Sequence, residues 1–254
     1  MEAMILAAGA GTRLRPLTDQ VPKALVQVGG RSLLEWVLDR LVAAGVDRVI
    51  VNAHYHEEQI RAFLKQMAPR GVDLAISPEP GGPFDTGGGL FAAAHLFKEA
   101  GPFLLHNVDV ISRIPLDELI AGHTSAQQRS PAQLVASLAV QQREANRRLL
   151  FDDLGLVGWE NRGREGALPG SRQVREPEGE LRRYSFTGIH VVEPKVFDLS
   201  DRTGAFSIVT LYLELAAQGY VVRPVDMSGH DWVDVGTPQR LSEADRVVRG
   251  RTPG

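Results

Sequence analysis

The sequence predicts an α/β fold, a three-layer sandwich in which helices cover both faces of a mixed, mostly parallel sheet. Three observations support this prediction. Short apolar runs alternate with segments of helical spacing, the connections are short, and a glycine-rich turn follows the first apolar run. At 254 residues the chain is long enough for one large α/β domain.

The first half contains the most regular pattern. Apolar runs predict strands at residues 3–8, 46–52, 72–76 and 103–105. Apolar stripes at helical spacing predict helices at residues 32–42, 57–67 and 90–98. The first of these helices has the clearest boundaries, since Ser32 and Glu35 are spaced as in a capping box and Gly45 stands where a helix would end.

The second half is less regular. We expect strands at residues 134–140, 184–192 and 221–225, and helices at residues 208–217 and 238–249. Residues 162–179 are rich in Gly, Pro, Arg and Glu, which predicts a loop or a mobile flap. The final residues, 250–254, are expected to form a frayed end.

Composition excludes several classes of protein. Apolar residues make up 43% and charged residues 23% of the chain, as in ordinary globular proteins. The net charge of −3 argues against a general nucleic-acid binder. Clustered basic residues favour a solvated face over a binding patch, because acidic residues interleave with them: Arg143, Arg147, Arg148, Arg182 and Arg183.

The chain has no cysteine, which excludes disulfides, thiolate metal sites and cysteine nucleophiles. The apolar run at residues 3–8 is too short for a signal peptide or a membrane span and has no basic segment before it. We therefore expect a cytoplasmic protein without a membrane partner.

The loop after the first strand predicts a phosphate-binding site. Gly9 and Gly11 allow a tight turn and close approach of a ligand to the backbone, and Arg13 and Lys23 add positive charge. A dinucleotide fingerprint would need glycine at Leu14, and a P-loop occurs nowhere. The alternative is a plain strand-to-helix turn with surface cations.

Two carboxylates follow apolar segments and suggest a metal site. Asp109 follows a buried strand that begins at Phe103, and ligands of open α/β sheets bind beyond such strand ends. Asp234 lies between apolar residues before a Gly-Thr-Pro turn. Together they suit Mg²⁺, which takes one or two carboxylates and completes its shell with phosphate oxygens and water. A turn or helix-cap role for Asp109 is the alternative.

A second glycine-rich loop spans residues 79–89, with five glycines in its last nine residues. Such a loop can bring main-chain groups close to a flat ligand such as a base; a flexible connection is the alternative. Gly87, Gly88 and Gly89 offer backbone groups and Glu79 or Asp85 an acceptor. Backbone donors and acceptors can match uracil, whereas a carboxylate would suit guanine, so we expect a uridine preference.

The sequence resembles sugar-1-phosphate nucleotidyltransferases. The segments at residues 6–14 and 22–25 resemble that family's signature, and residues 107–109, 186–189 and 232–238 resemble its first metal strand, its sugar-binding strand and its second metal carboxylate. These segments occur in the family's order over nearly the whole chain.

The resemblance implies a Rossmann-like nucleotidyltransferase fold and transfer of a nucleoside monophosphate from a nucleoside triphosphate to a sugar 1-phosphate. It divides the single domain into a nucleotide-binding part at residues 1–133, a mainly sugar-binding part at 134–230, and the second metal carboxylate with a closing helix at 231–254. It implies catalytic roles for Arg13 and Lys23 and Mg²⁺ ligation by Asp109 and Asp234. The implied nucleotide-binding residues are Leu6, Ala8, Gly9, Gly11, Thr12, Glu79, Gly87 and Gly88. The implied sugar-binding residues are Asn107, Glu176, Thr187 and Gly188.

The chain departs from the family at one position. Many members carry Glu-Lys-Pro before the Thr-Gly pair, with the lysine on the sugar phosphate, and here the segment reads Arg175-Glu176-Pro177. Arg175 is a candidate replacement, although guanidinium and ammonium groups are not interchangeable.

The resemblance favours members that make precursors of cell-wall or surface polysaccharides. We expect N-acetylmuramate 1-phosphate and UTP as substrates, with mannose- or heptose-1-phosphate guanylyl transfer as the alternative. A type-A glycosyltransferase is a further alternative, disfavoured because Asn107 interrupts the Asp-x-Asp it would need. A non-catalytic nucleotide-sensing subunit would be expected to lose a catalytic cation or metal carboxylate. We expect a monomer or small homo-oligomer.

Overall fold

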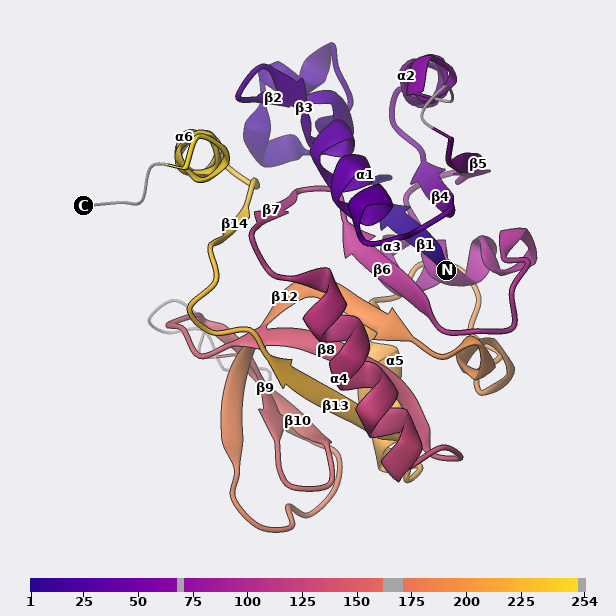
Figure 1. Ribbon diagram of the computed structural model, residues 1–254, viewed down its shortest axis with the longest axis vertical. Coiled ribbons are helices and arrows are strands. Elements are labelled where there is room, and N and C mark those ends of the chain that lie inside the picture. Colours follow the sequence, from indigo (N-terminus) through magenta and orange to yellow (C-terminus); the bar gives the residue numbers. More distant parts are fainter. Residues whose placement is uncertain (68–70, 162–170, 251–254) are drawn as a thin grey trace. The chain divides into compact units, whose positions relative to one another are not determined.

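The computed structural model describes residues 1–67, 71–161 and 171–250, and the chain divides into two compact units (Figure 1). The first unit contains Met1–Ile114, Arg202–Phe206 and His230–Gly254. The second contains Pro115–Asp201 and Ser207–Gly229.

A four-stranded parallel sheet forms the centre of the first unit. Its strands, in spatial order, are β6 (Phe103–Asn107), β1 (Glu2–Leu6), β4 (Arg48–Ala53) and β5 (Asp73–Pro78). The central strand β1 is buried along its whole length, as expected for a parallel sheet covered on both faces. The four strands predicted in the first half are therefore confirmed.

Helices and short connecting turns surround the strands of this unit. The α-helices of the first unit are α1 (Leu33–Ala43), α2 (Glu57–Met67), α3 (Asp85–Ala92) and α6 (Pro238–Val248). Its 3₁₀ helices are Thr12–Leu14, Leu17–Asp19, Lys23–Leu25 and Ala94–Leu96. The predicted capping of α1 is confirmed, because the hydroxyl of Ser32 accepts a 3.1 Å hydrogen bond from the N–H of Glu35.

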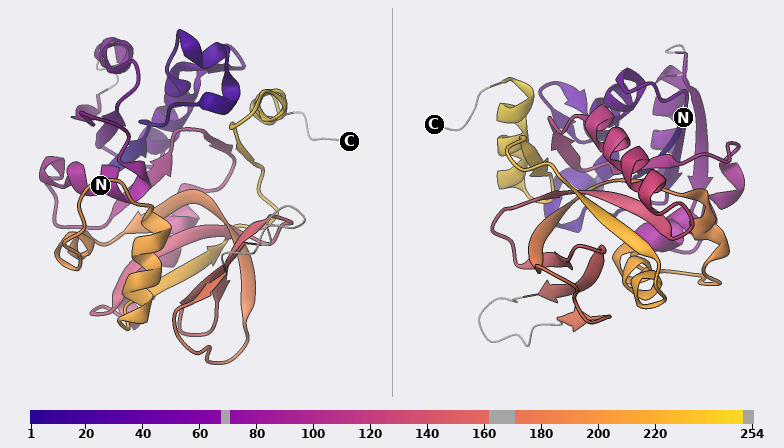
Figure 2. Two further views of the ribbon diagram at one scale, coloured as in Figure 1. Left: turned by 180° about the vertical axis from the view of Figure 1, so that it is seen from behind. Right: turned by 60° about the horizontal axis from the view of Figure 1, so that its bottom comes forward.

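Two small antiparallel ribbons complete the first unit. One pairs β2 (Gln27–Val28) with β3 (Arg31–Ser32), and the other pairs β7 (Val110–Ser112) with β14 (Trp232–Asp234). Figures 1 and 2 show α6, in yellow, beside β2 and β3. The carboxylate of Asp245 on α6 accepts a 2.9 Å hydrogen bond from the N–H of Gly29.

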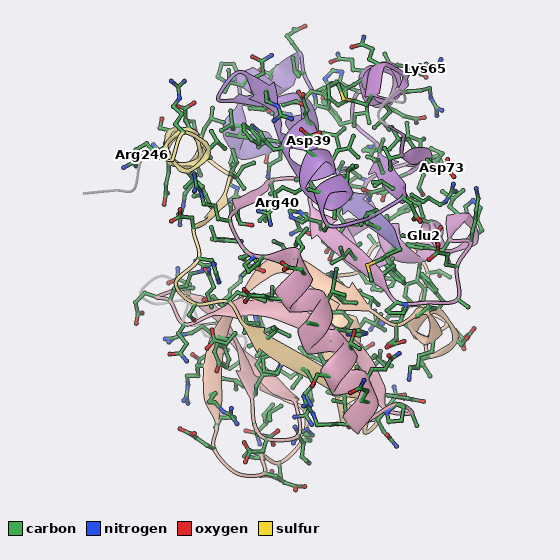
Figure 3. The ribbon with its side chains drawn as sticks, viewed as in Figure 1. Glu2, Asp39, Arg40, Lys65, Asp73 and Arg246 are labelled. Carbon is green, nitrogen blue, oxygen red and sulfur yellow. The ribbon has the colours of Figure 1, made fainter. Side chains whose placement is uncertain are left out.

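A half-buried arginine on α1 holds the β7 segment. Arg40, labelled in Figure 3, donates from Nη1 to the hydroxyl of Ser112 at 3.0 Å and from Nη2 to the carbonyl of Ile114 at 2.5 Å. Burial lowers the pKa of Arg40 to about 10, still well above neutrality. Helix α1 therefore fixes the strand that directly follows Asp109.

The second unit is built on a mixed sheet. Its strands, in spatial order, are β11 (Arg172–Gln173), β10 (Leu156–Asn161), β9 (Arg147–Phe151), β12 (Arg182–Val192), β8 (Leu134–Gln141) and β13 (Val221–Asp226). Only the β8–β13 pair is parallel among these described strands. Helices α4 (Leu116–Arg129) and α5 (Ile208–Ala217) lie on opposite faces (Figures 1 and 2), and a 3₁₀ helix spans Pro194–Asp198.

The predicted α/β fold with a mixed, mostly parallel sheet is confirmed, but two local predictions differ from the structure. The helix expected at residues 90–98 begins earlier, as α3, and takes in part of the second glycine-rich loop. The first long segment of the first unit ends at Ile114, and α4, which follows it, packs against β8 and β13. Within the expected loop at residues 162–179, residues 162–170 lie outside the described part, and Arg172–Gln173 forms a strand.

No helix within residues 1–67, 71–161 and 171–250 is both long and apolar enough to span a membrane.

Candidate active site

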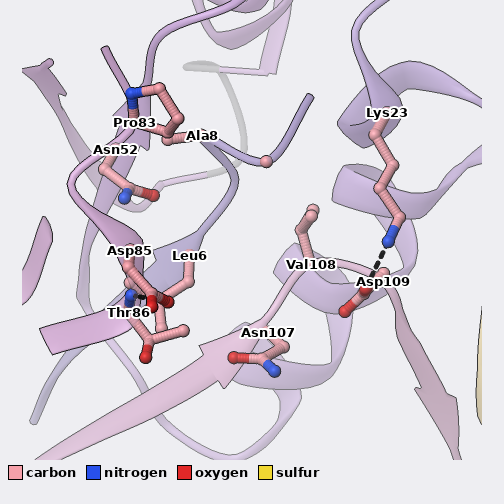
Figure 4. A pocket seen from close by; sticks show the side chains of 11 residues that line it. Leu6, Ala8, Lys23, Asn52, Pro83, Asp85, Thr86, Asn107, Val108 and Asp109 are labelled. Carbon is pink, nitrogen blue, oxygen red and sulfur yellow. Dashed lines mark hydrogen bonds and ion pairs between the residues drawn. The ribbon is translucent and has the colours of Figure 1, made fainter. Parts of the chain in front are cut away.

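A pocket of about 160 Å³ opens where the strands of the first unit end (Figure 4). Leu6, Ala8 and Gly9, at the end of β1, form part of its wall. A Cβ built on Gly9 would meet no atom within 4 Å, so the space beside this backbone is open. Of the predicted phosphate-binding glycines, Gly9 is the one that leaves room for a ligand.

Gly11 makes room for the side chain of Lys23. Its φ of +61° lies in the left-handed region that glycine adopts readily. A Cβ at this position would lie 2.9 Å from Cγ2 of Thr18 and 3.0 Å from Cβ of Lys23. The carbonyl of Gly11 also accepts a 2.9 Å hydrogen bond from the Thr18 hydroxyl. Gly11 and Thr12 are not among the residues lining the pocket.

Lys23 and Asp109 form an ion pair at the pocket wall (Figure 4). The 3₁₀ turn that carries Lys23 buries most of its side chain, which is 10% exposed, and Nζ donates to Oδ2 of Asp109. Asp109 follows β6, and the N–H of Val108 donates to the carbonyl of Leu6 at 3.1 Å. The end of β6 is thereby fixed beside the end of β1.

Asp234 lies next to Asp109 because β14, which ends at Asp234, pairs with β7, which begins directly after Asp109. Val110 on β7 faces Asp234 on β14, and the N–H of Val235 donates to the carbonyl of Asp109 at 2.8 Å. Arg13 reaches the same place, because its Nη2 and Oδ1 of Asp234 both lie close to Gly236. A Cβ built on Gly236 would be 2.7 Å from Nη2 of Arg13 and 3.0 Å from Oδ1 of Asp234. The fold thus brings both predicted cations and both predicted metal carboxylates together.

The environment of Asp234 fits a cation site. Burial raises the pKa of this carboxyl, the negative charge of Asp109 raises it further, and Lys23, Arg13 and Arg240 act in the opposite direction. Its Oδ1 is buried and has no hydrogen-bond partner within the described residues. A bound Mg²⁺ would satisfy this oxygen and remove the repulsion between the two carboxylates.

Asp109 and Asp234 are the two protein groups that we identify as candidate metal ligands. Across the described residues, no group of three or more His, Cys, Asp and Glu side chains could hold a metal. This composition suits Mg²⁺, which binds through one or two carboxylates together with substrate phosphates.

The second glycine-rich segment differs from the prediction. The N–H groups of Gly87 and Gly88 both donate to the carbonyl of Phe206, at 2.9 and 3.2 Å. A Cβ on Gly88 would lie 2.1 Å from the carbonyl oxygen of Gly204, and one on Gly87 would lie 2.4 Å from the ring of Phe206. These glycines allow α3 to pack against residues 202–206, and the N–H groups of Gly87 and Gly88 are used within the protein.

Glu79 is likewise used within the protein. Its Oε1 accepts a 2.6 Å hydrogen bond from Asn52, and its Oε2 accepts a 2.7 Å hydrogen bond from the N–H of Phe84. Asn52 also accepts a 2.6 Å hydrogen bond from the N–H of Ala7. This buried chain of contacts ties the ends of β1, β4 and β5 together, and each carboxylate oxygen of Glu79 accepts a hydrogen bond from within the protein.

Several pocket residues were not predicted as site residues: Asn52, Pro83, Thr86 and Val108. Asn52 could have been found from its place at the end of a predicted strand, beside the glycine loop. Asp85 is exposed at the start of α3, has a φ of +59°, and accepts a 2.6 Å hydrogen bond from the N–H of Thr86. Positive φ in a residue other than glycine is uncommon and concentrates at functional sites.

The predicted sugar-binding residues belong to both units. Asn107 lines the pocket of the first unit. In the second unit, the hydroxyl of Thr187 donates to the carbonyl of Ala139 at 2.7 Å, and Gly188, with φ of +81°, lies at an irregularity in the β8–β12 pairing. Glu176 is exposed in the same unit.

Arg175 is held by a carboxylate. It binds Asp152 through two hydrogen bonds of 2.6 and 2.7 Å, and its Nε donates to the carbonyl of Leu156 at 3.2 Å. Burial acts to raise the pKa of Asp152, but the hydrogen bonds from Arg175 and from three backbone N–H groups outweigh it and hold the pKa well below its usual range. This pairing argues against Arg175 as the replacement for the family's lysine.

The chain matches the family model described as "Nucleotidyl transferase" over residues 2–250. It is 34% identical to the N-acetylmuramate alpha-1-phosphate uridylyltransferase of Caulobacter vibrioides, covering 95% of this chain and 97% of that protein. The protein of the same name from Neisseria meningitidis serogroup B is also 34% identical, with 98% of each chain covered. A mannose-1-phosphate guanyltransferase of Yarrowia lipolytica is 30% identical, over 94% of this chain and 61% of that protein.

Solved structures resemble the fold. The inositol-1-phosphate CTP transferase of T. maritima superposes with a TM-score of 0.72 at 18% identity, covering 99% of this chain and 98% of that chain. Because the family model covers nearly the whole chain and two relatives match over almost their full lengths, this chain belongs to the nucleotidyl transferase family.

Proposed function

We propose that this chain transfers a uridylyl group from UTP to N-acetylmuramate 1-phosphate, releasing pyrophosphate. The broader activity is sugar-1-phosphate nucleotidyl transfer, which its relatives share. The observation that carries the proposal is the convergence of Arg13, Lys23, Asp109 and Asp234 at the end of the parallel sheet.

The chemistry requires alignment and charge stabilisation. A phosphate oxygen of the sugar 1-phosphate attacks the α-phosphorus, the bond to the bridging oxygen of the β-phosphate breaks, and pyrophosphate leaves with the negative charge. The attacking oxygen is already anionic, so no strong general base is needed. Positioned cations can therefore supply most of the catalysis.

The charged residues have distinct proposed roles. Lys23 binds the α-phosphate, where charge is redistributed as the bond breaks, and Arg13 binds the departing pyrophosphate through its planar guanidinium. Asp109 and Asp234 hold Mg²⁺, which supplies Lewis-acid stabilisation of phosphate charge when bound. The unpartnered Oδ1 of Asp234 supports this assignment.

The preference for uridine rests on the relatives. The two uridylyltransferases match over 97% and 98% of their own lengths, whereas the guanyltransferase of Yarrowia lipolytica is covered over 61%. One observation favours GTP as the second candidate: the exposed carboxylate of Asp85 lines the pocket and suits the N1–H and exocyclic amine of guanine.

Direct competition separates these candidates. UTP and GTP at equal concentration would be offered with N-acetylmuramate 1-phosphate, and in parallel with mannose 1-phosphate, with products identified by mass. We expect the UDP-sugar of N-acetylmuramate to dominate. Dominance of a GDP-sugar would contradict the proposal, and its loss in Asp85→Asn would identify Asp85 as the group that binds guanine.

A further inference from the structure

Three arginines from separate elements of the second unit line one hollow of about 250 Å³. Arg129 ends α4, Arg182 begins β12, and Arg223 lies on β13. Asp152 and Asp153, which follow β9, also line the hollow. The charges of these five residues determine what the hollow can bind.

Asp152 does not neutralise the three arginines. Arg175 binds both of its carboxylate oxygens, at 2.6 and 2.7 Å, and the N–H groups of Leu154, Gly155 and Glu178 donate to the same carboxylate at 2.9, 3.0 and 2.6 Å. The hydrogen-bonding capacity of Asp152 is therefore used by groups other than Arg129, Arg182 and Arg223.

Asp153 neutralises only one of them. Its carboxylate pairs with Arg182, whereas Arg223 donates to its backbone carbonyl. Arg129 donates to the hydroxyl of Ser125 at 3.0 Å. In the described part of the chain, neither Arg129 nor Arg223 forms an ion pair with a carboxylate.

The hollow consequently carries excess positive charge. Burial lowers the pKa of Arg223, and repulsion from Arg129 is the next largest cause, with Arg175 acting in the same direction against the attraction of Asp152 and Asp153. In addition, Nε of Arg182 is buried without a hydrogen-bond partner among the described residues. An anion in the hollow would relieve the repulsion among the guanidinium groups.

We propose that this hollow is a binding site for a phosphate group, held by Arg129, Arg182 and Arg223. The planar guanidinium matches the spacing of phosphate oxygens, and three of them can surround a tetrahedral anion. The volume suits a free phosphate ion or the phosphate end of a small monoester. The site is separate in sequence and in lining residues from the pocket around Lys23.

Equilibrium dialysis with labelled inorganic phosphate tests the proposal. In wild type we expect saturable binding that persists in Lys23→Ala, where phosphate binding at the catalytic pocket is weakened. Arg129→Gln and Arg223→Gln should each weaken the persisting site by about tenfold, because each removes a charge-assisted contact. The matched control is Arg249→Gln, since Arg249 pairs with Asp245 in the first unit.

The proposal would be overturned by the absence of saturable binding in Lys23→Ala, or by equal affinity in wild type, Arg129→Gln and Arg223→Gln. If Arg223→Gln fails to fold, as judged by circular dichroism, the exposed Arg129 position decides alone. Displacement by glycerol 3-phosphate would identify a monoester site, and binding of inorganic phosphate alone would identify a free-ion site. Equal displacement by chloride at matched ionic strength would contradict a phosphate site.

Discussion

The surroundings of Asp234 disfavour the ionised form of its carboxyl, and the same residue has a proposed role in metal binding. Burial and the nearby charge of Asp109 raise the pKa of its carboxyl, so the folded protein holds a proton here to a higher pH than the unfolded chain does. The unfolding free energy therefore falls as pH rises through the interval between the unfolded and folded pKa values. At neutral pH the ionised carboxylate destabilises the fold when no cation is bound.

Asp234→Asn should therefore increase stability while reducing activity. Without bound ligand, we expect a higher Tm than wild type at pH 7, and a kcat lower by about a hundredfold because a proposed metal ligand is lost. Thermal melts and initial rates on the same preparation check both effects. A lower Tm with unchanged kcat would indicate a structural cap instead.

Lys23→Ala should slow the chemical step more than it weakens nucleotide binding. Loss of one contact that stabilises transition-state charge costs about 3 kcal/mol, or roughly a hundredfold in kcat. Because Lys23 also pairs with Asp109, we expect the variant to bind Mn²⁺ more tightly than wild type in calorimetry without nucleotide. An unchanged kcat with a raised KM would contradict the catalytic role.

At the scale of elements, the glycines of the two loops should respond oppositely to substitution. A methyl group at Gly88 would collide with the carbonyl of Gly204, so Gly88→Ala should lower the unfolding free energy by about 1–3 kcal/mol. Gly9→Ala should leave stability near wild type but weaken nucleotide binding, since that space is open to the pocket. Urea unfolding and nucleotide titration measure the contrast.

Gly101→Ala is the matched control for Gly88→Ala and Gly9→Ala. A Cβ at Gly101 would meet no atom within 4 Å, and this residue lies outside the pocket. If Gly88→Ala were as stable as the control, the packing of α3 against residues 202–206 would not require glycine.

The Arg175–Asp152 pair should dominate the acid stability of the second unit. The folded pKa of Asp152 is well below its unfolded value, so its stabilisation is complete above the unfolded pKa and is lost as pH falls through the folded pKa. Arg175→Ala should lower the unfolding free energy at pH 7 by about 3 kcal/mol, because it leaves a buried carboxylate without its cation. Unfolding curves measured between pH 7 and pH 2 should show that the unfolding free energy of Arg175→Ala falls less at low pH than that of wild type.

Strands β1, β4 and β6 were predictable because each contains a continuous apolar run that is buried on both faces of the sheet. Helix α4 was missed because its apolar residues are sparse, and only contact with β8 and β13 makes its buried face evident. The convergence of Asp109 with Asp234 depends on pairing between strands far apart in the chain, which the family resemblance suggested and local pattern alone could not.

The glycines of α3 show where prediction from sequence fails. A glycine that admits a ligand and a glycine that admits another part of the backbone look identical in the sequence. What separates Gly9 from Gly88 is the carbonyl of Gly204, which arrives from a distant segment. Prediction from sequence also fails for Arg175. Its carboxylate partner, Asp152, lies in the turn that follows β9, and the sequence alone does not show that this turn meets Arg175.

At the scale of the whole molecule, nucleotide binding should stabilise the protein in a metal-dependent way. All four proposed catalytic residues belong to the first unit. At a hundredfold excess over its Kd, Mg²⁺–UTP should add about 2.7 kcal/mol to the unfolding free energy. Hydrogen exchange should slow around residues 6–14 and at the start of α3, and excess chelator should abolish both effects.

Protection confined to the second unit would contradict this assignment of the nucleotide site. Asp109→Asn should bind Mg²⁺–UTP more weakly, and the exchange pattern in the second unit serves as its internal reference.

The ion pair between Lys23 and Asp109 has a consequence for the protein between turnovers. The ammonium group of Lys23 pairs with Asp109, a proposed metal ligand, so the lysine acts as a counter-ion and limits repulsion between the two carboxylates. If Asp109 and Asp234 held a metal ion together with a nucleotide, Asp109 would have to release this ammonium group, and the α-phosphate would become its new partner. Binding would then be an exchange of ionic partners, in which no charge at the site goes unmatched. A cation without a nucleotide would have to compete with Lys23 for Asp109, which favours loading of the metal and the nucleotide together.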